Sequence, residues 1–185
     1  MDRVCLVKPN KRPVAWNEIK LIVFDCDGVF TDGRIIYGEH RQELKHFHGH
    51  DGMGFLLLRQ TDIKTAVITG RSSEALARRC EDLKIDFLFQ GIYNKLKCLN
   101  ELLESLGLEH KNVVYMGDDW NDVPVMRKVA FSATPADAQA DVQKIADWVT
   151  PKNGGQGAVR ELINYVLLRK GIYEKIVLHY LEDIC

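Results

Sequence analysis

The sequence lacks a long run of apolar residues, and its charges nearly balance. No apolar stretch approaches the roughly 20 residues that a membrane-spanning helix needs, and the amino terminus has no signal-peptide pattern. The formal net charge is −1 over 185 residues, so a basic surface for nucleic acid is not indicated. We therefore expect a cytoplasmic protein whose partners include neither membrane nor nucleic acid.

Closely spaced cysteines are also lacking. The 5 cysteines are odd in number, widely scattered and form no C-x-x-C pair. This pattern indicates neither a disulfide framework nor a cysteine-based zinc site. What is present is an ordinary globular composition, with 46% hydrophobic and 28% charged residues, in a chain long enough to bury a full core.

The chain is expected to form one domain with an extension at each end. Residues 1–17 contain two prolines and several charges, which is typical of an arm that leads into a domain. We assign residues 18–171 to the domain and residues 172–185 to a C-terminal tail with a helical pattern. Apolar and polar residues alternate on both sides of Gly38, which predicts a β-hairpin over 34–48.

Strand-like and helix-like segments alternate through most of the chain. Strand patterns fall at 21–24, 64–69, 86–90, 113–116, 129–132 and near Trp148, and the longer helical patterns fall at 51–59, 72–83 and 94–106. We expect Asp51 to cap the first of these helices. The alternation predicts an α/β fold, with a single doubly wound parallel sheet flanked by helices and the hairpin as a small insertion.

The first strand pattern runs directly into Asp25-Cys26-Asp27-Gly28. Side chains at the carboxyl end of a parallel strand face the crevice where such sheets bind ligands. Two carboxylates this close repel each other unless a cation or a shared proton lies between them. The motif favours carboxylates around a hard metal ion, with one of them free to act as a nucleophile, although a polar turn after a strand looks similar.

Three further strand patterns are followed by polar groups. They are Thr69-Gly70-Arg71, then Lys95 after the strand at 86–90, then Gly117-Asp118-Asp119 with Asp122. Taken alone, each has an ordinary explanation as a helix cap, a surface charge or an acidic turn. Because they follow successive strands, they indicate one site that combines a phosphate cradle, a fixed cation and metal-binding carboxylates.

Together these motifs resemble the haloacid dehalogenase superfamily of phosphotransferases, over about residues 20–165. The resemblance implies that Asp25 attacks phosphorus and becomes an aspartyl phosphate. It also implies that Asp27 acts as general acid for the leaving alkoxide and then as general base for water. Mg²⁺ would be held by the side chains of Asp25 and Asp118 and by the backbone carbonyl of Asp27.

The same resemblance implies roles for four further side chains. Asp119 and Asp122 would support the metal ligands, while Thr69 and Lys95 would bind phosphate oxygens. Cys26 is interpreted as a small packing residue, not as a nucleophile.

The spacing of the motifs leaves no room for a large cap domain of the kind that many superfamily members use. The interval from Asp25 to Thr69 is 44 positions (69 − 25), and the interval from Lys95 to Asp118 is 23 positions (118 − 95). A capless site is open, so either it accepts a macromolecule or a neighbouring subunit closes it. The hairpin is our candidate for an oligomer contact, because a two-stranded ribbon is unstable alone.

Longer motifs resemble the 3-deoxy-D-manno-octulosonate 8-phosphate phosphatase family. They include Phe47-x-x-x-Asp51-Gly-x-Gly, Gly117-Asp-Asp-x-x-Asp-x-Pro and Gly154-Gly-x-Gly-Ala-Val-Arg-Glu. The resemblance implies a homotetramer whose hairpins and C-terminal segments help to complete neighbouring sites. It implies a small acidic sugar phosphate as substrate, dephosphorylated in the synthesis of lipopolysaccharide precursors. The substrate-binding residues that it implies are Asp27, His48, Gly49, His50, Asp51, Gly52, Arg71, Arg79, Lys95 and Asn121.

Several alternatives stay open. The family usually has arginine at the position of His50, so a nine-carbon acid 9-phosphate of the sialic-acid type is a competing substrate. A protein or nucleotide phosphatase, or a non-catalytic partner of a sugar-acid activation complex, would use the same fold. His46, His48 and His50 would share one face of a strand, which is compatible with a zinc site.

Overall fold

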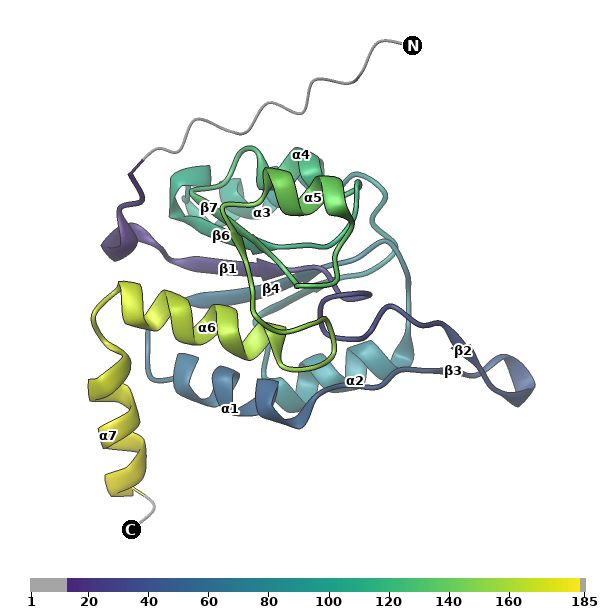
Figure 1. Cartoon of the computed structure of the whole chain (residues 1–185), viewed down its shortest axis with the longest axis horizontal. Helices are drawn as coiled ribbons and strands as arrows, with labels where there is room; N and C mark the ends of the chain where they lie inside the picture. Colours follow the sequence, from purple (N-terminus) through teal and green to yellow (C-terminus); the bar gives the residue numbers. More distant parts are fainter. Residues whose placement is uncertain (1–12, 184–185) are drawn as a thin grey trace.

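A six-stranded parallel sheet forms the centre of the protein (Figure 1). In this computed structural model, which describes residues 13–183, the strand order is β5-β4-β1-β6-β7-β8. The strands are β1 (Leu21–Phe24), β4 (Lys64–Ile68), β5 (Phe87–Phe89), β6 (Val113–Met116), β7 (Phe131–Thr134) and β8 (Trp148–Val149). All neighbouring pairs are parallel, which confirms the predicted doubly wound fold.

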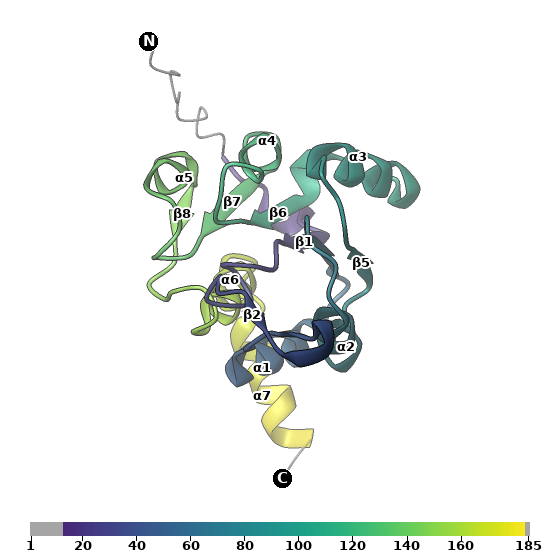
Figure 2. The same cartoon turned by 90° about the vertical axis from the view of Figure 1, so that its right-hand side faces the viewer.

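Helices cover both faces of this sheet (Figures 1 and 2). One face carries α3 (Lys95–Leu106), α4 (Val123–Met126) and α5 (Ala140–Ile145), and the other carries α1 (Gly49–Leu58), α2 (Glu74–Leu83) and α6 (Ala158–Arg169). Successive side chains of a strand point to opposite faces. Accordingly Leu21 and Val23 of β1 join the core under α3 to α5, while Ile22 and Phe24 join the core under α1, α2 and α6.

Local signals set the helix ends. The Asn94 side chain caps α3 by accepting a hydrogen bond from the Lys97 amide at 3.0 Å, and Gly107 ends the helix at a φ of 63°. The expectation that Asp51 caps α1 is wrong. The helix begins two residues earlier, at Gly49, and the His48 Nδ1 atom accepts the hydrogen bond from the His50 amide at 3.3 Å.

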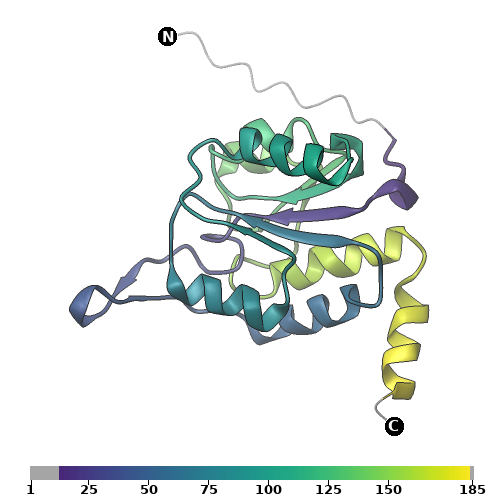
Figure 3. The same cartoon turned by 180° about the vertical axis from the view of Figure 1, so that it is seen from behind.

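The predicted hairpin is present, with shorter strands than the sequence pattern indicates. Its strands are β2 (Ile36–Tyr37) and β3 (Glu43–Leu44), which pair antiparallel, with the 3₁₀ turn η2 (Glu39–Arg41) between them. Figures 1 and 3 show this ribbon projecting from the body of the protein. Ile35, Tyr37 and Leu44 are exposed there, so its apolar side chains have little of their own chain to pack against.

The structure describes part of the predicted N-terminal arm and most of the predicted C-terminal tail. Within the predicted arm, residues 13–17 are described and include the start of η1 (Trp16–Glu18), while residues 1–12 lie outside the described part. In the predicted tail, α7 (Tyr173–Asp183) packs with α6 and α1, and Ile176 is buried. None of the helices in residues 13–183 has both the length and the apolar character that crossing a bilayer requires.

Candidate active site

The strand register brings the predicted site residues to one edge of the sheet. Phe24 of β1 lies opposite Met116 of β6 and Val67 of β4. Asp25 is therefore the first residue beyond the central strand, and its amide donates to the Met116 carbonyl at 2.9 Å. The chain runs from β1 outward to β4 and β5, then returns to β6 on the other side of β1. This reversal creates the crevice in which doubly wound sheets bind ligands.

Lys95 forms the buried centre of the site. Its Nζ atom lies 2.9 Å from Asp25 Oδ2 and 2.6 Å from Asp122 Oδ1, and its side chain is 1% exposed. The two carboxylates raise the pKa of Lys95, against the opposing effect of burial. The alternative of a surface lysine is excluded by this position.

Asp122 holds both the lysine and the loop after β6. Its Oδ1 atom also accepts a hydrogen bond from the Tyr115 hydroxyl at 2.5 Å. Its Oδ2 atom accepts from the amides of Asp118 and Asp119, at 3.0 and 3.2 Å. Both oxygens of this fully buried carboxylate are thus used inside the protein. Asp119, by contrast, is exposed and accepts from the Trp120 amide at 2.7 Å.

Asp25, Asp118 and Asp122 form the one group in the described residues that could hold a metal ion. Their ligand atoms all lie within 4.8 Å of one another. Burial and the neighbouring carboxylates raise the pKa of Asp25 to about 7 and that of Asp118 to about 8. Asp25 Oδ1 is buried and has no hydrogen-bond partner. Since Asp122 is already saturated, Asp25 and Asp118 are the residues that fit a hard divalent cation.

Glycines allow this close packing. At Gly28, where φ is 81°, an added Cβ would lie 2.1 Å from Asp118 Oδ2. At Gly154 it would lie 1.9 Å from the Gly28 carbonyl oxygen, and the neighbouring Gly155 amide donates to the Val29 carbonyl at 3.1 Å. The Gly154–157 loop therefore rests directly against the turn that carries Asp27 and faces Asp118.

Asp27 lies at the more open side of the site and faces two cations. Lys45 makes an ion pair with Asp27 Oδ1, and Arg71 Nε lies 3.7 Å from Asp27 Oδ2. Glu43 joins both cations, with Oε1 at 3.1 Å from Lys45 Nζ and Oε2 at 2.5 Å from Arg71 Nη2. Arg71, predicted to bind substrate, is thus paired with carboxylates of its own chain.

The other predicted substrate residues fall into two groups. Thr69 and Asp51 are buried: Thr69 lies at the end of β4, and Asp51 Oδ1 accepts from the Arg160 amide at 3.0 Å. Arg79 donates to the His48 carbonyl at 3.2 Å, and its guanidinium lies over the Phe47 ring. Gly49, His50 and Asn121 are exposed, whereas His48 and Gly52 are partly buried.

The alternative zinc arrangement of the three histidines is not observed. It required one strand, but β3 ends at Leu44 and α1 begins at Gly49. The His48 and His50 rings meet edge to face at 4.8 Å, whereas His46 joins no metal-binding group among residues 13–183.

Sequence reasoning missed Lys45, Glu43 and Tyr115. Positions 43 and 45 lie on the same face of an extended chain, so two opposite charges there were a usable signal. Tyr115 stands in an otherwise aliphatic strand, and a buried tyrosine hydroxyl needs a polar partner. Cys26 agrees with its interpretation as a packing residue, because it is fully buried and burial raises the pKa of its thiol far above its usual range.

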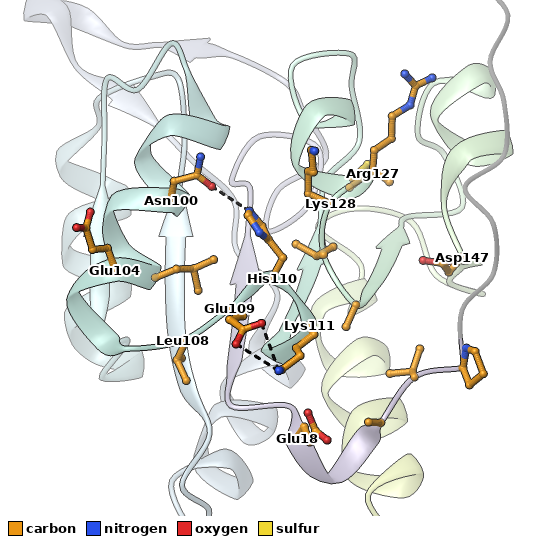
Figure 4. A pocket seen from close by; sticks show the side chains of 17 residues that line it. Glu18, Asn100, Glu104, Leu108, Glu109, His110, Lys111, Arg127, Lys128 and Asp147 are labelled. Carbon is orange, nitrogen blue, oxygen red and sulfur yellow. Dashed lines mark hydrogen bonds and ion pairs between the residues drawn. The ribbon is translucent and has the colours of Figure 1, made fainter.

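A second hollow lies at the opposite end of the sheet (Figure 4). It has a volume of about 1000 Å³ and is lined by residues that precede β1, β6, β7 and β8, together with part of α3. Four of its polar side chains form pairs: His110 with Asn100 at 2.9 Å, and Lys111 with Glu109 at 3.2 Å. The catalytic candidates are at the other ends of the same strands, so this hollow is separate from the site.

Comparisons with known proteins agree with this geometry. A family model described as haloacid dehalogenase-like hydrolase matches residues 84–163. The 3-deoxy-D-manno-octulosonate 8-phosphate phosphatase KdsC of Escherichia coli (strain K12) is 44% identical over 153 residues, which cover 83% of this chain and 81% of that protein. The enzyme of the same name from Salmonella typhimurium is 43% identical over 165 residues, which cover 89% of this chain and 87% of that protein.

A solved structure gives the same assignment. The 3-deoxy-D-manno-octulosonate 8-phosphate phosphatase from Moraxella catarrhalis, in complex with magnesium, phosphate and KDO, has a TM-score of 0.86 and 35% sequence identity. The match covers 89% of this chain and 95% of that one. On its sequence, its fold and the carboxylates that follow β1 and β6, this chain belongs to the 3-deoxy-D-manno-octulosonate 8-phosphate phosphatase family of haloacid dehalogenase-like hydrolases.

Proposed function

We propose that this protein is a cytoplasmic, Mg²⁺-dependent phosphatase that hydrolyses 3-deoxy-D-manno-octulosonate 8-phosphate through an aspartyl phosphate. The observation that carries the proposal is the state of Asp25. One of its oxygens is held by Lys95 at 2.9 Å, while the other is buried without a partner, and the carboxylates of Asp25 and Asp118 offer ligand atoms within 4.8 Å of each other. A carboxylate fixed on one side and free on the other is suited to in-line attack on phosphorus.

In this mechanism Asp25 attacks phosphorus while Lys95 offsets the charge of the phosphate oxygens. Asp27 gives a proton to the leaving alkoxide and later takes one from the water that hydrolyses the aspartyl phosphate. Thr69, at the end of β4, binds a phosphate oxygen. Asp118 and Asp25, with the Asp27 backbone carbonyl, would hold Mg²⁺, and Asp122 would keep the Asp118 loop and Lys95 in place. The bound ion would offset the negative charge of the phosphate and the carboxylates.

Substrate recognition is assigned to side chains around the mouth of the crevice. Arg71 and Arg79 suit the carboxylate of a sugar acid, and residues 48–52 with Asn121 would contact the sugar. The name of the relatives and the sugar acid in the Moraxella complex support an eight-carbon acid.

We also infer a homotetramer in which hairpins complete neighbouring sites. The hairpin projects from the body and exposes Tyr37 at 73% and Leu44 at 50%. Apolar residues on an unsupported ribbon are expected to be covered by another surface, and other copies of this chain would supply it.

The test is phosphate release from a panel of sugar-acid phosphates with Mg²⁺, using wild type beside Asp25→Asn. Preference for the eight-carbon 8-phosphate, abolished by the substitution, is the expected result. Preference for a nine-carbon acid 9-phosphate would keep the mechanism and change the substrate, with His50 as the residue to examine. No release from any sugar-acid phosphate would sink the proposal and favour a non-catalytic partner.

A further inference from the structure

Lys45 is a buried cation next to the site that the proposed mechanism does not use. It follows β3, and its side chain is 2% exposed although lysine is among the residue types least often buried. Its ammonium is balanced by the carboxylates of Asp27 and Glu43, with Glu43 Oε1 at 3.1 Å. A lysine buried in this way keeps a fixed position, since moving it would leave the carboxylates of Asp27 and Glu43 with the partly exposed Arg71 as their remaining cation.

Together with Arg71 these side chains form what we term the charge cluster: Asp27, Glu43, Lys45 and Arg71. Its two cations and two carboxylates alternate, so that the formal charges cancel. Each oxygen of Asp27 faces a different cation, Lys45 on Oδ1 and Arg71 on Oδ2. The two contacts differ in strength, because Arg71 Nε is 3.7 Å away and its side chain is 39% exposed. Lys45 is therefore the main restraint on the orientation of this carboxylate.

The orientation of Asp27 matters because proton transfer requires the carboxylate within hydrogen-bond reach of the leaving oxygen. We propose that Lys45 is a positioning residue: it holds the Asp27 carboxylate in place for proton transfer, and with Glu43 it connects the hairpin to this step. The inference rests on the role of Asp27 in the proposed function. The hairpin strands are two residues long and form few hydrogen bonds with each other. The ion pairs of Lys45 with Asp27 and Glu43 therefore connect the hairpin to the reacting centre.

The test compares phosphate esters that differ in how much their leaving group needs a proton. Lys45→Met removes the charge at similar length, Lys45→Arg keeps it, and Asp27→Asn removes the acid itself. Each is measured with the sugar-acid phosphate, with glycerol 3-phosphate and with 4-nitrophenyl phosphate, whose leaving group departs without protonation. The value of kcat/KM reports on the steps up to leaving-group departure, so hydrolysis of the aspartyl phosphate does not enter the comparison.

For Lys45→Met we expect kcat/KM to fall about 10- to 100-fold on both alkyl phosphates and less than about threefold on the aryl phosphate. Lys45→Arg should recover most of the lost kcat/KM on the alkyl phosphates. It also provides a second test of the inference if Lys45→Met folds poorly. A matched control is Lys64→Met, which removes the ion pair with Asp86 at the other end of the sheet and should leave all three values unchanged.

Other outcomes are decisive as well. An equal loss on all three esters would reduce Lys45 to a structural support, and a loss confined to the sugar-acid phosphate would make it a substrate ligand. Either overturns the inference while leaving the proposed function intact, provided that Asp27→Asn shows the leaving-group pattern. If Asp27→Asn shows no such pattern, the role of Asp27 in the proposed function fails, and the inference fails with it.

Discussion

Asp122 and Lys95 stabilise the site as a pair of buried charges that cannot be separated without a large cost. Asp122 accepts four hydrogen bonds, from Lys95, Tyr115 and two amides of its own loop. Removing one partner of such a pair leaves an uncompensated charge in the interior, which typically costs about 3–5 kcal/mol. The arrangement keeps Lys95 charged and places it against Asp25 before substrate arrives.

Asp25 and Asp118 make the stability of the metal-free protein depend on pH. Their pKa values are raised to about 7 and about 8, whereas in the unfolded chain they return to about 4. The folded state therefore binds more protons across this window, and stability falls as pH rises from about 4 to about 8. In EDTA we expect the thermal midpoint to fall by several degrees over that range, as measured by scanning calorimetry.

Two further measurements isolate this effect. Mg²⁺ requires the ionised carboxylates, so its stabilisation should grow with pH. Asp118→Asn should show a shallower pH dependence in EDTA than wild type. A midpoint in EDTA that rises between pH 5 and pH 8, with Asp118→Asn following the same curve, would contradict the raised pKa values.

At the scale of elements, two helices far apart in sequence are joined by one buried carboxylate. Asp51 in α1 accepts a hydrogen bond from the Arg160 amide in the first turn of α6. Burial raises the pKa of Asp51 to about 6, although this hydrogen bond and nearby cationic side chains oppose the shift. The hydrogen bond to the Arg160 amide therefore stabilises the folded state, whereas the negative charge of the buried Asp51 carboxylate destabilises it.

Substitutions at Asp51 should separate these two contributions. Asp51→Asn keeps an acceptor and removes the ionisation. Its free energy of unfolding relative to wild type should therefore improve by about 1–3 kcal/mol as pH rises from about 4 to about 7. Asp51→Ala removes the acceptor as well as the ionisation, so relative to Asp51→Asn it should cost about 1–3 kcal/mol at either pH. Urea denaturation at both pH values measures this, and a parallel pH dependence of wild type and Asp51→Asn would disprove it.

Contact between loops also determines the geometry of the site. Gly155 has a φ of 66°, and an added Cβ would lie 2.6 Å from the Asp32 amide nitrogen in the turn that follows β1. Gly155→Ala should therefore displace this turn and lower kcat by at least about tenfold. Gly107→Ala is the matched control, because its φ is 63° but no atom lies within 4 Å of the added Cβ. It should lose about 1–2 kcal/mol of stability and keep full kcat. Equal kcat in the two variants would refute the contact argument.

At the scale of the whole molecule, the periodic patterns predicted the sheet and helices well, because apolar spacing reports directly on which side chains are buried. Residues 21–24 and 113–116 were predicted as strands with the bounds observed for β1 and β6. Apolar spacing could not predict the contacts that depend on the path of the hairpin relative to the site. Lys45 reaches Asp27 only because β3 runs toward the site, and His48 displaces Asp51 as the cap because the chain turns before α1.

The hairpin also leads to a prediction about assembly. Leu44→Glu places a charge on the exposed ribbon, and we expect it to convert the proposed tetramer into smaller species at micromolar concentration and to lower activity. Leu168→Glu on α6 is matched in residue type and exposure, at 54% against 50%, and should leave the assembly unchanged. Light scattering coupled to gel filtration measures both variants. A monomeric wild type, or a Leu44→Glu variant that remains tetrameric, would show that the hairpin is not the contact.

The position of Cys26, between Asp25 and Asp27, has a chemical consequence for the folded protein. Oxidants and alkylating agents react with the thiolate, and this thiol is both inaccessible and strongly disfavoured from ionising. The carboxylates on either side discourage its anion further, since like charges repel. We therefore expect peroxide and iodoacetamide to leave Cys26 unmodified in the folded protein, so that a sulfur atom at the centre of the site does not make catalysis sensitive to the redox state of the cell.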